Sequence, residues 1–143
     1  MKNLKLNFTI FFLLVLIGCS NSTKGQVPEE VKTTFKAKYP GETDPDWHKD
    51  KNGNFESHFK IDGKHYRADF SPTGNWIETE RSIDEKDLPE VVKEAIKLKY
   101  KKYKIDEIEE VQHAQKGLFY DVEFKIDGDK KDVEFNSSGA VIN

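Results

Sequence analysis

The sequence of 143 residues contains a single cysteine, Cys19, and carries a formal net charge of −3. One cysteine excludes both a disulfide bond within the chain and a metal cluster held by several thiolates. The weakly acidic charge argues against a nucleic-acid-binding protein. The sequence also lacks the Gly-x-Ser-x-Gly, His-Glu-x-x-His and glycine-rich phosphate-loop motifs. We therefore predict a protein that is not an enzyme, requires no cofactor or metal and binds no nucleic acid.

Aromatic side chains, in contrast, are plentiful. The sequence contains ten phenylalanines, and aromatic residues make up 12% of it. This apolar content is sufficient for a compact core although 34% of the residues are charged. A folded domain is therefore expected.

The N-terminal segment has the pattern of an export signal. Residues 8–17 form a nearly unbroken apolar run, which is too short to cross a bilayer core of about 30 Å but is typical of a secretory signal. The following Leu16-Ile17-Gly18-Cys19 resembles a bacterial lipobox, which implies cleavage before Cys19 and attachment of lipid to it. We predict a lipoprotein signal peptide over residues 1–18 and a flexible tether over residues 19–26.

Two consequences for location follow. The lipid on Cys19 would hold the protein on a membrane of the cell envelope, such as the outer membrane. No acidic residue directly follows Cys19, so we expect the protein to face the periplasm. The alternative is an ordinary secretory signal that ends by chance at a cysteine.

A five-residue sequence occurs twice. Phe-Lys-Ile-Asp-Gly occupies residues 59–63 and again residues 124–128. Each copy follows a segment with apolar residues at spacing four, which indicates an amphipathic helix. We infer a tandem duplication, with one unit over residues 27–82 and a second over residues 83–143.

Each unit is predicted to contain one helix and four antiparallel strands. The first helix is marked by Val27, Val31, Phe35 and Tyr39, and the second by the matching series Leu88, Val92, Ile96 and Tyr100. Alternating apolar and polar residues, separated by turn residues, predict strands at 47–51, 55–61, 65–70, 75–81, 108–115, 119–126, 130–135 and 140–142. Asp87 and Glu90 have the spacing of a capping box. The fold class is therefore α+β, with one eight-stranded sheet and both helices on one face.

This pattern resembles the PepSY-like domains related to beta-lactamase inhibitor protein. The resemblance covers residues 27–143 and rests on repeated openings, hairpins and closing turns: Val27-Pro28-Glu29, Leu88-Pro89-Glu90, the two Phe-Lys-Ile-Asp-Gly hairpins, Pro72-Thr73-Gly74 and Ser137-Ser138-Gly139. It implies a concave open sheet face that binds, and in some cases inhibits, another protein. The chain lacks disulfide-forming cysteines, so inhibition of a beta-lactamase in particular is not implied.

The first hairpin supplies the candidate partner-binding residues. If Asp62-Gly63 forms a two-residue turn, His58, His65 and Arg67 lie together on the open face as a basic, pH-sensitive patch. The matching face of the second hairpin is more acidic. Such polarity suggests an oriented envelope protein or peptide as the partner. Trp76 would join this face as a binding anchor if Ile77 faces the core, and would be buried if it does not.

Other interpretations of this face stay open. It could be an ordinary solvated surface of a structural envelope component. It could also bind a small ligand or a metal, with His58 and His65 as zinc ligands alongside Glu56 or Asp69.

Overall fold

The computed structural model describes residues 26–126 and 128–143, which form two α-helices and one antiparallel sheet of seven strands. The proposed signal peptide and Cys19 lie outside the described residues, as does Asp127 of the second repeat. Neither helix is long and apolar enough to cross a membrane.

The strands follow one another in the sheet in the order of the sequence, each antiparallel to the next. Their bounds are β1 Asp46–Lys49, β2 Phe55–Ile61, β3 Lys64–Phe70, β4 Trp76–Ser82, β5 Lys104–His113, β6 Gly117–Ile126 and β7 Asp129–Asn136. The turn at Asp62 and Gly63 was predicted correctly. Both residues have positive φ, as a two-residue hairpin requires, and Phe59 lies opposite Tyr66.

The two helices begin directly after a proline. The first, α1 (Glu29–Lys38), follows Pro28, and the second, α2 (Glu90–Lys99), follows Pro89. Acidic residues in the first turn and lysines in the last turn of each helix complement the helix dipole. The predicted capping box was wrong, because α2 has no side-chain cap and Asp87 belongs to the preceding 3-10 helix η1 (Glu85–Asp87).

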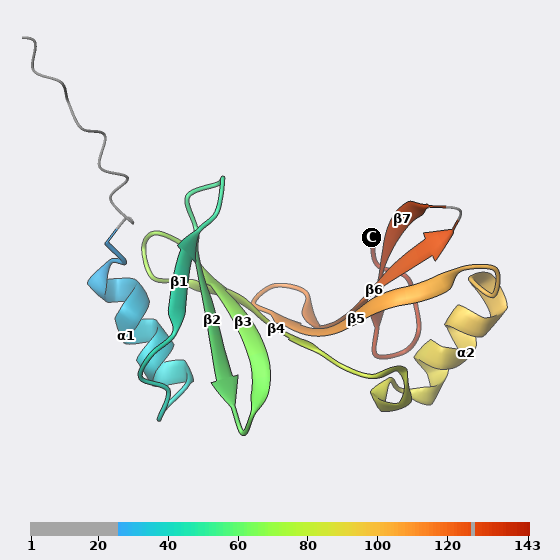
Figure 1. Cartoon of the computed structure of the whole chain (residues 1–143), viewed down its shortest axis with the longest axis horizontal. Helices are drawn as coiled ribbons and strands as arrows, with labels where there is room; N and C mark the ends of the chain where they lie inside the picture. Colours follow the sequence, from blue (N-terminus) through green and yellow to red (C-terminus); the bar gives the residue numbers. More distant parts are fainter. Residues whose placement is uncertain (1–25, 127) are drawn as a thin grey trace, which may run out of the picture.

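Each helix packs its apolar stripe on the sheet and closes a separate core. The α1 core contains Val31, Phe35, Tyr39, Phe55, Phe59, Ala68 and Phe70. The α2 core contains Leu88, Val92, Ile96, Ile108, Tyr120, Val122, Phe124, Val133 and Phe135. Strand register places both sets of sheet residues on the same face, as predicted. Figure 1 shows the helices at opposite ends of an elongated molecule, with β4 and β5 between them.

The helices and the closing turns meet in the same way at both ends. Gly74 lies so close to the backbone of Glu30 that a Cβ at Gly74 would be 2.8 Å from the carbonyl carbon of Glu30. In the same way, a Cβ at Gly139 would be 2.7 Å from the carbonyl oxygen of Val91. Each glycine thus allows a turn to pack on the first turn of a helix. The duplication itself remains a prediction.

The prediction of an eighth strand was wrong. Residues 140–142 contribute only an isolated bridge between Val141 and Phe135. The backbone N–H of Glu134, which would continue a ladder, donates instead to the side chain of Asn143 at 3.1 Å. The second helix is therefore followed by three strands of the sheet, and the first by four.

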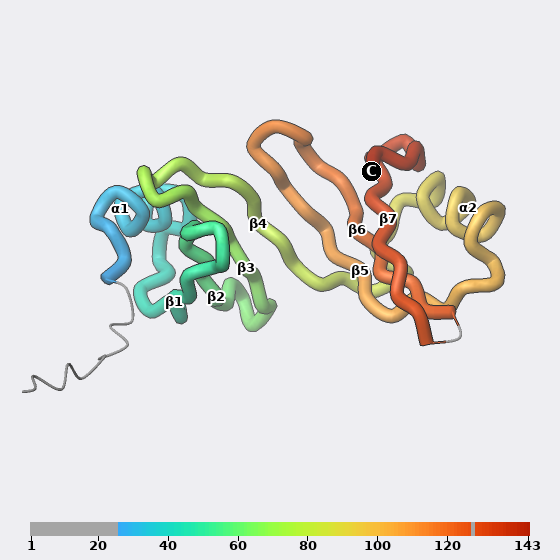
Figure 2. Tube along the Cα trace, turned by 90° about the horizontal axis from the view of Figure 1, so that it is seen from above, coloured from blue at the N-terminus to red at the C-terminus, as the bar shows by residue number. Residues whose placement is uncertain are grey.

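The helices leave one face of the sheet uncovered by any element of the described residues. In Figure 2, seen from above, the neighbouring strands β4 and β5 cross the middle of the molecule and join the two ends of the sheet. We call the uncovered side the open face. Its side chains in β2 to β6 form the candidate site.

Candidate functional site

His58, His65 and Arg67 lie on the open face, as predicted. His58 pairs across the hairpin with Arg67, and His65 pairs with Lys60. His65 is exposed, and the side chain of Arg67 is about one-third exposed, at 37%.

The predicted basic character of this patch was wrong. The Arg67 Nε atom lies 3.7 Å from Asp69 Oδ2 and 4.0 Å from Glu56 Oε2. A terminal nitrogen of the same guanidinium contacts Glu80 Oε2. Arg67 is therefore enclosed by carboxylates, and its charge is more than offset.

The zinc arrangement on the two histidines is not assembled. His58 Nε2 lies 2.5 Å from Glu56 Oε1, and its ring packs edge-on against His48 at a centroid distance of 5.1 Å. Among the described residues, the three potential ligands whose atoms converge are Asp69, Glu78 and Glu80. This cluster already contains a cation, since Arg67 contacts Glu80.

Trp76 does not lie on the open face. A β-bulge shifts the register, so that Glu78 lies opposite Asp69 while Trp76 lies opposite Phe70. The extra residue is Ile77. Trp76 therefore packs on the α1 core, where its indole N–H donates to Thr79 Oγ1 at 3.0 Å. If the side chains alternated regularly from Glu78 back to Trp76, Trp76 would lie on the open face together with Glu78.

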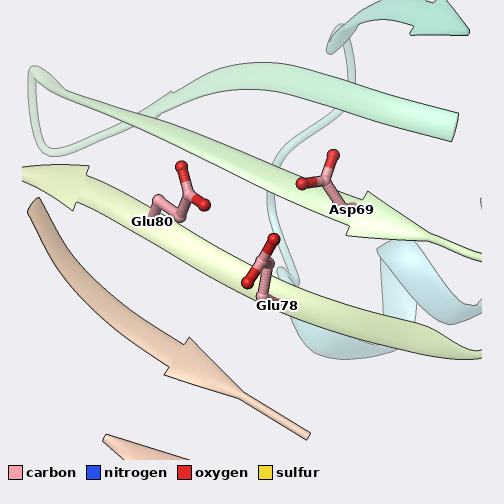
Figure 3. A group of neighbouring side chains, drawn as sticks. All are labelled: Asp69, Glu78 and Glu80. Carbon is pink, nitrogen blue, oxygen red and sulfur yellow. The ribbon is translucent and has the colours of Figure 1, made fainter. Parts of the chain in front are cut away.

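The main feature that the sequence analysis missed is a group of acidic side chains on the open face. We call it the acidic basin, and it consists of Glu56, Asp69, Glu78, Glu80, Glu109 and Asp121 around Arg67. Three of these carboxylates, from Asp69, Glu78 and Glu80, have oxygens within 4.8 Å of one another. Figure 3 shows them on β3 and β4, projecting from the same side of the sheet.

Because these carboxylates are partly buried, their ionised forms are destabilised. Burial of the side chain raises the pKa of Glu80 to about 8; Arg67 opposes the rise, and the nearby Glu109 and Glu78 add to it. The pKa of Asp69 rises to about 6 for the same first reason, with Arg67 again opposing. Burial also raises the pKa of Glu109 and of Asp121. Glu80 therefore retains its proton at neutral pH.

The signal for the basin was present in the sequence but incomplete. Glu78 and Glu80 alternate along one strand, and Glu107 and Glu109 along the next. The bulge at Ile77 decides which face the first pair occupies. The pairing of β4 with β5 brings Glu109 next to them, although α2 separates the two strands in sequence.

Comparison with protein families identifies a match over more than half of the chain. The sequence profile of the PepSY-like, beta-lactamase-inhibitor-like family matches residues 54–142. None of the curated proteins compared with the chain matches it.

Solved structures from Bacteroides share the fold. A DUF2874 family protein of Bacteroides ovatus is 21% identical with a TM-score of 0.73, covering 81% of this chain and 84% of its own. A BLIP-like protein of Bacteroides fragilis is 21% identical with a TM-score of 0.72, covering 83% and 86%. A Bacteroides eggerthii protein described as periplasmic is 20% identical with a TM-score of 0.73, covering 83% and 88%. At these identities the likeness concerns the fold alone.

The raised pKa of Glu80 predicts that folding stability falls as pH rises. In the unfolded chain Glu80 loses its proton near the ordinary value of 4.5, whereas the folded chain retains it to about 8. The stabilisation is therefore complete below pH 4.5 and is lost as pH rises through 8. As pH rises over this range, the unfolding free energy of Glu80→Gln should fall less than that of the wild type, by on the order of 1–3 kcal/mol.

Urea denaturation at pH values between these limits measures the effect. Glu94→Gln, an exposed change on α2, is the matched control and should leave the slope unchanged. Parallel pH profiles for the wild type and Glu80→Gln would contradict the prediction.

Proposed function

The chain belongs to the PepSY-like family of beta-lactamase-inhibitor-like proteins, and we propose that it binds another protein of the cell envelope on its open sheet face. The binding is noncatalytic. The family description, beta-lactamase-inhibitor-like, also supports inhibition of the bound partner. The protein faces the periplasm in this proposal, in keeping with the location described for the Bacteroides eggerthii structure.

The acidic basin is the observation that carries the proposal. Partly buried like charges oppose folding, and strongly shifted pKa values of this kind concentrate at functional sites. The uncovered face also offers a sheet surface across several strands, whereas α1 and α2 each close a core on the two ends of the opposite face. His58, His65 and Arg67 belong to the proposed surface at its β2–β3 side. Trp76 is left out of it, because its side chain packs on the α1 core.

We further propose that lipid on Cys19 holds this domain at a membrane. The lipobox-like residues 16–19 support the proposal, and the polar segment up to residue 26 would act as the tether. Because the tether is short, the open face would act close to the membrane surface, and the partner would be a neighbouring envelope protein or peptide.

Lipidation predicts a change of fraction when the cysteine is replaced. Cys19→Ser should move the protein from the membrane fraction to the soluble fraction and abolish incorporation of labelled palmitate, because the acyl acceptor is gone. Ser20→Ala is the matched control and should remain membrane-bound and labelled. Retention of Cys19→Ser in the membrane at the wild-type level would count against the anchor.

Binding on the open face predicts position-specific crosslinking. A photoreactive phenylalanine analogue in place of His65 should crosslink one envelope protein in intact cells, and the same analogue in place of Glu94 on α2 should not. Both positions are exposed, so the analogue is equally accessible. The identified protein, once purified, should bind the wild-type chain and bind Glu78→Lys at least about tenfold more weakly, because this change reverses a charge on the open face. Equal crosslinking from both positions, or none from His65, would reject the proposal.

A further inference from the structure

The acidic basin contains more negative charge than its own cation can offset. Arg67 forms ion pairs with Glu56, Asp69 and Glu80. Among the described residues, Glu78 and Glu109 have no ion-pair partner within 4.0 Å, although both are half-buried. We infer that the segment of the partner bound on the open face is basic, an extended stretch whose lysine or arginine side chains enter the acidic basin. This inference rests on the proposed function.

The half-buried uncompensated charge lies at the centre of the face. Toward β7, Lys116 lies 2.7 Å from Glu134 and Lys130 lies 2.6 Å from Glu123, and Asp132 is exposed to solvent. Among the described residues, Asp121 has no such pair, and its Oδ1 atom is buried without a hydrogen-bond partner. A bound cation would therefore gain most at the centre, where the acids are partly buried and lack a cation of their own.

The spacing of the carboxylates suits an extended chain. Glu78 and Glu80 are two residues apart on β4, with Asp69 beside them on β3 and Glu109 beyond them on β5. Neighbouring strands are about 4.8 Å apart, so the basin extends about 19 Å from β2 to β6. Alternate side chains of an extended peptide are about 7 Å apart. Two or more basic side chains on one side of such a peptide can therefore reach separate carboxylates.

An apolar anchor is disfavoured at the same place. Val111 and Phe119 face the open side next to the acids, but only 2% and 3% of their surfaces are exposed. A hydrophobic partner would bury little apolar surface there, whereas a cationic side chain would contact the negatively charged carboxylates of the acidic basin.

A single metal ion is also disfavoured. The oxygens of Asp69, Glu78 and Glu80 converge, but the guanidinium of Arg67 contacts one of them. A divalent cation at this point would lie beside an existing positive charge and would leave Glu109 and Asp121 uncompensated. Separate ammonium or guanidinium groups can be distributed over all of these acids.

Labelled octalysine tests the inference with the full chain purified in detergent. Fluorescence anisotropy should show binding that weakens when salt rises from about 0.05 to 0.5 M, because screening shortens the reach of the charges. The double variant Glu78→Gln/Glu109→Gln should bind octalysine at least about tenfold more weakly, a loss typical of close charge pairs at interfaces.

Glu29→Gln/Glu94→Gln, with the same change in net charge on the helix side, is the matched control and should bind as the wild type does. Circular dichroism checks that both variants are folded. Equal octalysine affinity in the two double variants would overturn the inference, as would calcium alone saturating the basin and displacing the peptide. If octalysine fails to bind while the partner crosslinks from position 65, the basic segment is rejected and the proposed function survives. Loss of that crosslink would reject the proposed function instead.

Discussion

One-sided packing of the helices is the constraint on which the rest of this structure depends. At one end, the ring of Phe35 of α1 packs edge-on against the rings of Phe59 and Trp47, with centroid distances of 5.1 and 5.3 Å. At the other, α2 closes a second core on the same face. Both apolar stripes are thus used on one side of the sheet. The other side carries mainly polar residues, and the strand order brings the acids of β3, β4, β5 and β6 together in its centre.

The acidic basin shows how this arrangement can cost stability and serve binding at once. Glu80 is the most buried of the six acids, with 8% of its side chain exposed, and it contacts Arg67. A single guanidinium among six carboxylates leaves a surplus of negative charge that only protons or an external cation can offset. The proposed basic partner would provide that cation, and charge complementarity of this kind directs which partners associate and how they are oriented.

Much of the fold could be predicted from the sequence because local signals sufficed. Both helices follow from apolar spacing after proline, and the Asp62-Gly63 turn sets the register that pairs His58 with Arg67. The site was harder because it depends on features without a local signal. The bulge at Ile77 turned Trp76 toward the α1 core, and the pairing of β4 with β5 brought Glu109 beside Glu80. Arg67 was placed on the correct face, but its neighbours were not foreseen.

The account is tested most directly by the pKa of Glu80, measured from the pH titration of its carboxyl carbon by nuclear magnetic resonance in the folded protein. The Glu80→Gln spectrum assigns the signal. If the basin is crowded and undercompensated, the carboxyl should titrate near the value of about 8 rather than the ordinary 4.5. A midpoint at or below 4.5 would show that Arg67 satisfies Glu80 fully, and the surplus charge on which the binding proposal rests would not exist.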